Sequence, residues 1–374
     1  MVYLDYCANT PVDREILSYF SKIEEDFFGN ANSAHEAGRK TAELIVKARD
    51  RIAEILDVLP EEVIFTSGAS EANNTAIKGY CHARRHFGRH IITNPLEHPS
   101  VSAPLTYLSN NGYQVDMLKI GKDGKIDPDH LRSLLKEDTI LLTLCAVDSE
   151  LGTLQPIKEV IAILKDYPNC KLMVDATQAV GKTDICLEGI DLWTCSAHKF
   201  YGLNGSGLLI KKKDVVLEPL IHGGSSTTVY RSGTPTAALD CALEKALSKA
   251  IESQPERYER VRQLNDRLRD FFAGYPEVKI NSPKDAIPHI LNLSVTGIKG
   301  NTIQQLLNEK GIYVSVKTAC SVEGLPSRPV LAVTNDRKRA LCSWRISLSH
   351  LLKDEEISEF ETVFDTIYRE NLCI

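Results

Sequence analysis

The stretches MVDATQ at 173–178 and SAHKFYG at 196–202 decide the fold class of this chain. Each includes the end of an apolar run that is typical of a buried strand, Lys171–Asp175 in one case and Leu192–Ser196 in the other. In open α/β sheets, ligands bind outside the carboxyl ends of the strands. We therefore expect the Asp and the Lys of these stretches to face one ligand site.

The same kind of strand recurs through the first two thirds of the chain. Further runs rich in Val, Ile and Leu lie at Glu62–Thr66, His90–Thr93, Gln114–Lys119, Thr139–Val147 and Gly207–Lys211. Amphipathic stretches separate them, at His35–Leu56, Glu71–Phe87, Pro128–Lys136 and Ile157–Lys165. Continuous apolar strands that alternate with helices are typical of a parallel sheet covered on both faces. We predict an α/β fold with a mostly parallel seven-stranded sheet.

The pattern changes near Ala237. A long helical segment is predicted from there to about Ala273, followed by short strands and further helices. This mixture predicts a second, smaller α+β domain. We expect a large α/β domain at 13–250 and a small domain at 251–374 that also takes in 1–12.

Composition excludes several classes of function. The chain has 374 residues with 44 Lys or Arg and 50 Asp or Glu, a formal net charge of −6 that argues against nonspecific nucleic-acid binding. The longest apolar run, Ile140–Val147, is too short to cross a bilayer, and the start MVYLDYCANT lacks the pattern of a secretory signal. Ten cysteines without a C-x-x-C pair are typical of reduced thiols. We expect a cytoplasmic protein with no nucleic-acid partner, no membrane partner and no metal.

The side chains at the strand ends suit one cofactor. A buried carboxylate such as Asp175 needs a cationic or hydrogen-bonding partner, and a protonated heteroaromatic nitrogen would serve. Lys199 could form a Schiff base with an aldehyde. The turn FTSGASE at 65–71 leads into a helix whose free N–H groups favour a phosphate, and His98 could stack on a ring. Together these features are what a pyridoxal phosphate site requires.

Short motifs run in order along nearly the whole chain, from Tyr3 to about Leu348. They are YLDYCANTPV, FGN with a nearby SAH, FTSGASEANN, EH, VDATQ, SAHKFYG, RSGT, ACS and RISL. In this order they resemble the cysteine desulfurase family, which belongs to the class V aminotransferase group of fold-type-I pyridoxal phosphate enzymes. The resemblance implies a homodimeric pyridoxal phosphate-dependent transferase.

The resemblance also implies a role for each matching residue. Lys199 would carry the cofactor as an imine, Asp175 would pair with its pyridinium nitrogen and Gln178 would bind its phenolic oxygen. His98 would stack on the ring and handle protons. The other cofactor contacts would come from Ala69, Ser70, Ser149, Ser196, His198 and Thr234. Of these, Thr234 would reach across to the cofactor of the other subunit.

The substrate positions follow from the same resemblance. Arg345, helped by Asn30, would bind the substrate carboxylate, which suits a planar guanidinium. Cys320 would be the nucleophile that takes the sulfur of L-cysteine as a persulfide and leaves L-alanine. A sulfur-acceptor protein, either a scaffold or a sulfur carrier, would then receive the sulfur for iron–sulfur cluster assembly or thiolation.

Four positions around the expected site depart from the family pattern. Ser149 stands where the family usually has an Asn, and Thr228 lies in a stretch where the family usually has a Glu-Arg pair. Lys317 and Ser349 stand where the family usually has glycines. These changes leave two alternatives open. One is a pyridoxal phosphate-dependent lyase or aminotransferase of the same fold that acts on a different amino acid. The other is a catalytically weak paralogue that binds a partner.

Overall fold

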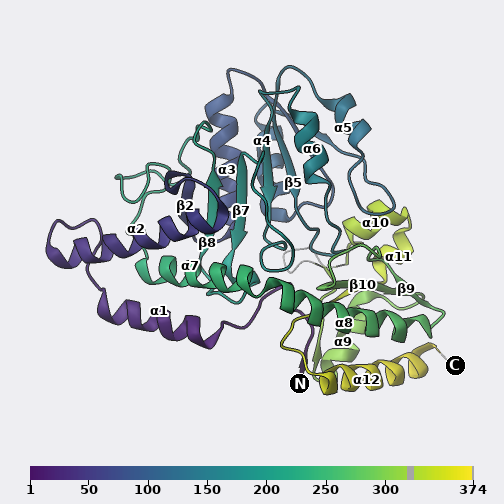
Figure 1. Cartoon of the computed structure of the whole chain (residues 1–374). Helices are drawn as coiled ribbons and strands as arrows, with labels where there is room; N and C mark the ends of the chain where they lie inside the picture. Colours follow the sequence, from purple (N-terminus) through teal and green to yellow (C-terminus); the bar gives the residue numbers. More distant parts are fainter. Residues whose placement is uncertain (318–323, 373–374) are drawn as a thin grey trace.

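A seven-stranded sheet forms the centre of the computed structural model, which describes residues 1–317 and 324–372 (Figure 1). The strand order is β2-β8-β7-β6-β5-β3-β4. Strands β4, β3, β5, β6 and β7 pair in parallel, whereas β8 is antiparallel to both β7 and β2. The strands are β2 Val63–Thr66, β3 His90–Thr93, β4 Gln114–Met117, β5 Thr139–Cys145, β6 Lys171–Asp175, β7 Leu192–Ser196 and β8 Gly207–Lys211. The predicted fold class is confirmed.

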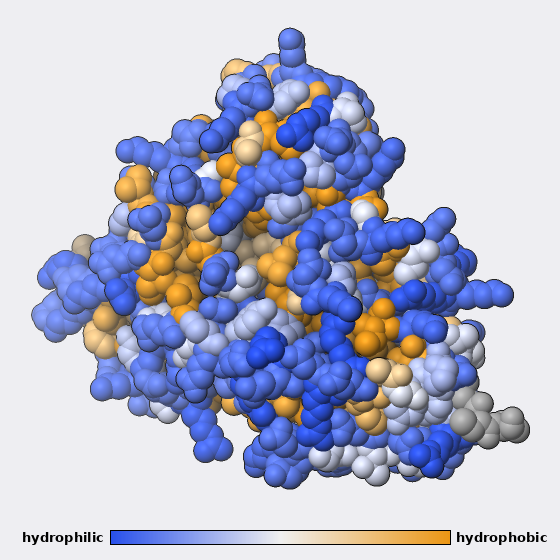
Figure 2. All heavy atoms as spheres, turned by 45° about the vertical axis from the view of Figure 1, so that its right-hand side comes forward, coloured by the Kyte–Doolittle hydropathy of each residue, from blue (hydrophilic) through white to orange (hydrophobic). Residues whose placement is uncertain are grey.

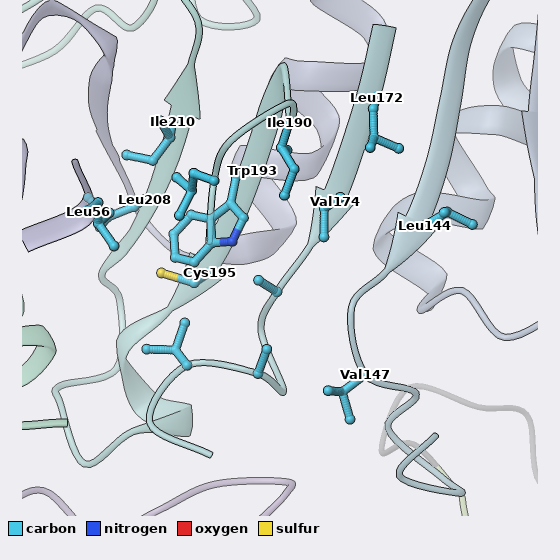
Figure 3. Close-up of a cluster of buried hydrophobic side chains, with 14 of the residues drawn as sticks. Leu56, Leu144, Val147, Leu172, Val174, Ile190, Trp193, Cys195, Leu208 and Ile210 are labelled. Atoms are coloured by element: carbon cyan, nitrogen blue, oxygen red, sulfur yellow. The ribbon is translucent and has the colours of Figure 1, made fainter. Parts of the chain in front are cut away.

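Buried side chains alternate between the two faces of this sheet. On β6, Leu172 and Val174 belong to one apolar cluster and Met173 belongs to another. Figure 3 shows the first cluster, in which Trp193 of β7 lies beside the aliphatic side chains. Because both faces are covered, the strands are continuous apolar runs, as the sequence predicts.

Helices cover each face of the sheet. Helices α2, α5, α6 and α7 contribute side chains to the cluster in Figure 3, while α3 and α4 pack on the opposite face. Helix α1 packs against α7. The bounds are α1 Arg14–Asp26, α2 Glu36–Leu56, α3 Ala69–Arg84, α4 Pro99–Asn110, α5 Pro128–Leu134, α6 Ile157–Leu164 and α7 Ala237–Glu252, with short 3₁₀ turns η1 Pro60–Glu62 and η2 Ala197–Lys199.

The smaller part of the molecule has a three-stranded antiparallel sheet in the order β12-β10-β9. Its separate core contains Trp344 of β12 with Phe272 of α8 and Phe364 of α12. Strand β1 pairs in parallel with β11 and ties the N-terminal residues to this part. The elements are β1 Val2–Tyr3, α8 Gln254–Ala273, β9 Val278–Ile280, β10 Ile290–Val295, α9 Gly300–Glu309, β11 Ile312–Tyr313, α10 Arg328–Thr334, α11 Arg337–Leu341, β12 Ser343–Ser347 and α12 Asp354–Leu372.

The single helix predicted at 237–273 is two helices in the structure. Helix α7 ends at Glu252, and α8 begins after Ser253 with Pro255 in its first turn. Proline lacks an N–H and clashes with the preceding turn of a helix, so it begins a helix better than it continues one. The charged, amphipathic pattern across this break conceals it in the sequence.

The break falls where the two cores meet. Helix α7 packs on the large sheet, whereas α8 buries its apolar side chains in the core of the smaller part. We propose that the domains divide here, with 13–250 in the large domain and 251–374 together with 1–12 in the small one.

The face of the molecule in Figure 2 is mainly hydrophilic, and apolar side chains gather on it in separate patches. None of the described helices combines the length and apolar character needed to span a membrane. A cavity lies at the carboxyl ends of β6 and β7, and Arg345 of β12 in the smaller part also lines it.

Candidate active site

A cavity of about 400 Å³ lies at the carboxyl ends of the central strands. Most of the residues that the sequence assigns to a site line it. They are Ala69, Ser70, His98, Ser149, Asp175, Gln178, Ser196, His198, Lys199 and Arg345. Asp175 ends β6 and Lys199 follows β7, so the structure brings these two strand ends together at one cavity.

Two predicted residues lie outside the cavity, and the structure does not describe a third. Thr234 is exposed in the segment before α7 and does not line the cavity of this chain. Asn30 is also exposed outside the cavity, and its Oδ1 accepts a hydrogen bond from the backbone N–H of Asn32. Cys320 lies outside the described residues. The roles of all three remain predictions.

Lys199 ends the short turn η2 directly after β7. Its Nζ donates hydrogen bonds of 2.7 Å to the backbone carbonyls of Cys7 and Ala8. Burial and the nearby charge of Lys182 lower the pKa of Lys199 to about 8. A neutral amine is the nucleophilic form, so this environment favours attack on an aldehyde.

Asp175 is the last residue of β6 and is 6% exposed. Its Oδ2 accepts a hydrogen bond from Nδ2 of Asn73 at 2.9 Å, and its Oδ1 accepts one from the backbone N–H of Thr177 at 2.9 Å. Among the described residues, no cationic side chain forms an ion pair with this carboxylate. A buried anion held by neutral donors at a cavity wall suits a protonated ring nitrogen.

Gln178 points a fixed amide at the same cavity. Its Oε1 accepts a hydrogen bond from Nζ of the buried Lys182 at 2.5 Å, and its Nε2 donates to the carbonyl of Cys7 at 2.9 Å. Because the lysine occupies the oxygen, the amide nitrogen is the end that can donate to an anionic oxygen in the cavity.

The other end of the cavity is built from small residues. Helix α3 begins at Ala69 without a side-chain cap, so the N–H groups of its first turn are available to an anion. Gly68 has φ +144°, and a Cβ there would lie 3.3 Å from Oγ of Ser196. Oγ of Ser196 also lies 2.8 Å from Nδ1 of His198. These donors fit a phosphate.

Arg345 on β12 closes the cavity from the smaller part. Its side chain is 2% exposed, and Nη2 lies 2.7 Å from Oδ1 of Asp5. Nη1 donates to the backbone carbonyl of Ser149 at 2.7 Å. The guanidinium plane is thereby held against the cavity wall, which suits bidentate binding of a carboxylate.

His98 caps helix α4 on the wall next to Asp175. Its Nδ1 accepts a hydrogen bond from the backbone N–H of Ser100. Burial lowers the pKa of His98, although the charge of Asp175 opposes this shift. The ring is therefore neutral near pH 7.

The four residues that depart from the family pattern differ in whether they line the cavity. Ser149 lines the cavity, and Ser349 bonds the hydroxyl of Tyr201 at 2.7 Å. Lys317 donates to the carbonyl of Leu325, and the hydroxyl of Thr228 accepts from a neighbouring backbone N–H. Ser149 is thus the departure that can touch a ligand in this cavity.

The sequence did not single out Asn73, Asp5 or Lys182. Asn73 and Asp5 do lie inside the motifs FTSGASEANN and YLDYCANTPV, and Lys182 follows Gln178 by four residues. The residues that they contact are distant in the chain or are set by local side-chain geometry. Membership in a motif was therefore the only feature of the sequence that could have pointed to Asn73 and Asp5.

Comparison with known proteins gives this arrangement a family. The class-V aminotransferase family matches residues 2–360. The chain belongs to the class-V aminotransferase family. The donor set described above fits the cofactor of this family, pyridoxal phosphate, which supplies an aldehyde and an electron-withdrawing ring. The predicted family and cofactor are confirmed.

Curated proteins resemble the chain over most of its length. A "NifS/IcsS protein homolog" of Lactobacillus delbrueckii subsp. bulgaricus is 36% identical over 375 residues, covering 99% of this chain and 97% of that protein. A "Cysteine desulfurase IscS" of Dictyoglomus turgidum is 37% identical over 338 residues, covering 89% and 86%.

Solved structures agree with these relatives. A "NIFS-LIKE PROTEIN" has a TM-score of 0.93 at 33% identity and covers 99% of both chains. A structure titled "SspA in complex with cysteine" has a TM-score of 0.82 at 30% identity and covers 93% of this chain and 99% of that one.

Proposed function

We propose that this chain is a pyridoxal phosphate-dependent cysteine desulfurase that converts L-cysteine to L-alanine and passes the sulfur to an acceptor. The observation that carries the proposal is one cavity that holds an amine, a carboxylate and a guanidinium, from Lys199, Asp175 and Arg345. The names of the curated relatives and the cysteine complex of SspA support this substrate.

The geometry supports a division of roles around the cofactor. Lys199 would hold the cofactor and, once released, move the proton at the α-carbon of the substrate. Asp175 would hold the proton of the ring nitrogen, and Nε2 of Gln178 would donate to the phenolic oxygen. The turn at Ala69 and Ser70, with Ser196 and His198, would bind the phosphate.

Arg345 would orient the substrate by its carboxylate. Asp5 offsets part of the charge of this buried guanidinium, and the contact with the carbonyl of Ser149 fixes its plane. A monocarboxylate with a small side chain would then lie between Arg345 and Lys199, which both line the cavity. Asn30 would help Arg345 to bind this carboxylate.

The sulfur step rests on the family motif around Cys320. Its thiolate would attack the sulfur of L-cysteine, so that an S–S bond forms and the C–S bond breaks. The electron pair of that bond stays with carbon, which takes up a proton and leaves as L-alanine. The enzyme retains the sulfur as a persulfide and passes it to a scaffold or sulfur-carrier protein. A homodimer with Thr234 at the partner's cofactor, and a cytoplasmic location, complete the proposal.

A substrate screen tests this function against the alternatives. Protein loaded with pyridoxal phosphate and supplied with a thiol reductant should release L-alanine and sulfide in equal amounts from L-cysteine. Lys199→Ala should abolish both products, whereas Lys213→Ala, which removes an exposed lysine, should retain them. Turnover of another amino acid with none of L-cysteine would establish a lyase or aminotransferase instead. Failure to bind pyridoxal phosphate would establish a catalytically weak paralogue.

A further inference from the structure

A chain of hydrogen bonds through buried and partly buried side chains links Asp175 to His98 along the cavity wall. Asn73 on α3 is fully buried, and its Nδ2 donates both to Oδ2 of Asp175 and to Oγ of Ser100, each at 2.9 Å. Oδ1 of Asn73 accepts from the hydroxyl of Thr194 at 2.6 Å. Oγ of Ser100 lies 2.8 Å from Nδ1 of His98.

The directions of the bonds made by Asn73 are fixed, and they leave the hydroxyl of Ser100 able to donate to His98. An ionised carboxylate only accepts, so Asp175 requires the amide nitrogen of Asn73 on its side. That nitrogen has two hydrogens, and the second one goes to Oγ of Ser100. With its oxygen already accepting, the Ser100 hydroxyl has its own hydrogen free for Nδ1 of His98.

A second contact gives the same direction independently. The backbone N–H of Ser100 can only donate, and it lies 3.1 Å from Nδ1 of His98. Nδ1 is therefore an acceptor in both contacts. A neutral imidazole whose Nδ1 accepts carries its one proton on Nε2.

We propose that Asn73 and Ser100 are positioning residues that hold His98 as the neutral tautomer protonated on Nε2. In this tautomer the ring has no free lone pair, so His98 enters the reaction as a hydrogen-bond donor. The base that collects substrate protons is then Lys199, whose amine faces the same cavity. The same Asn73 amide also donates to the Asp175 carboxylate, so one side chain would position two of the residues that would hold the cofactor. This inference rests on the proposed function for the roles of His98 and Asp175.

The tautomer can be measured without turnover. Full-length protein labelled with ¹⁵N-histidine and loaded with pyridoxal phosphate is studied by long-range ¹H–¹⁵N correlation, which distinguishes a protonated ring nitrogen from an unprotonated one. His98→Gln identifies the signals of this ring. The wild type should show His98 with Nε2 protonated and Nδ1 unprotonated. A proton on Nδ1, or a doubly protonated ring near pH 7, overturns the proposal.

Variants then test the two positioning residues. Asn73→Ala removes a donor from a buried carboxylate, so the milder Ser100→Ala is the variant on which the test rests. It should shift the Nδ1 signal of His98, while Ser100→Thr, which keeps a hydroxyl, should restore it. Ser102→Ala lies on the same helix outside the hydrogen-bond chain and is the matched control. An Nδ1 signal in Ser100→Ala identical to that of the wild type overturns the proposed role of Ser100.

A kinetic measurement separates this inference from the proposed function. Loss of one net hydrogen bond corresponds to a roughly five-fold change. Ser100→Ala should therefore lower kcat for L-cysteine about five-fold and leave KM nearly unchanged, since the proposed function assigns the substrate carboxylate to Arg345. If the wild type does not turn over L-cysteine, the proposed function fails, while the tautomer measurement still decides the inference.

Discussion

Lys199 should react with an aldehyde at neutral pH far faster than an ordinary lysine. Burial and the charge of Lys182 lower its pKa from the ordinary value of 10.5 to about 8. The sign follows because removal from water penalises the ammonium form, so the neutral amine appears at lower pH. Near pH 7, roughly one chain in ten then carries a neutral Lys199, against roughly one in three thousand for an ordinary lysine. The reactive fraction is roughly 300-fold larger.

Reconstitution of cofactor-free protein measures this fraction. The rate of pyridoxal phosphate incorporation, followed by absorbance, should rise with pH and level off above about pH 8 to 9. Free Nα-acetyl-lysine, treated in parallel, accounts for titration of the aldehyde itself. A rate that keeps rising tenfold for each pH unit through about pH 10, as an ordinary amine does, would refute the reasoning.

Two charge-removing variants sharpen the same experiment. Lys182→Met removes a positive charge from the neighbourhood of Lys199, so the pKa of Lys199 should rise and the midpoint of the rate profile should move to higher pH. Lys213→Met removes the same charge from an exposed position and should leave the midpoint unchanged. Equal midpoints in both variants would show that Lys182 does not act on Lys199.

Three further variants test the site and the core. Asp5→Asn leaves the buried guanidinium of Arg345 without its anionic partner and should lower the free energy of unfolding by about 3 kcal/mol in urea titration, whereas the exposed Asp129→Asn should change it little. Arg345→Lys should raise KM for L-cysteine about 10- to 100-fold, because a lysine cannot bind a carboxylate in the bidentate way; an unchanged KM would place the substrate carboxylate elsewhere. Leu172→Ala should cost about 2–5 kcal/mol of stability, with the half-exposed Leu351→Ala as control, and a loss equal to the control would contradict the packing in Figure 3.

The strands and the strand-end residues could be predicted because both signals are local. Continuous apolar runs mark β6 and β7. Asp175, which ends β6, and Lys199, which follows β7, must then emerge at one edge of the sheet. The break between α7 and α8 is harder to recognise, since the amphipathic pattern continues across Ser253 and only Pro255 marks it.

The partners of the site residues could not be predicted, because they depend on tertiary packing. Asn73 and Asp175 are 102 residues apart, and Asp5 and Arg345 are 340 apart, yet each pair is in hydrogen-bond contact. The periodicity of a sequence does not indicate which distant residues form a hydrogen bond. The position of Thr234 is a different case, because its predicted target is the cofactor of another subunit.

The most direct test of the central claim is a search for the persulfide itself. Protein loaded with pyridoxal phosphate receives L-cysteine without a reductant, is alkylated, digested and analysed by mass spectrometry beside a Cys320→Ser variant and a Cys186→Ser control, whose cysteine is exposed. The account predicts one added sulfur atom on the Cys320 peptide of the wild type and the control, together with L-alanine, and loss of sulfur transfer in Cys320→Ser. L-alanine production without added sulfur at Cys320, or full sulfur transfer by Cys320→Ser, would contradict it.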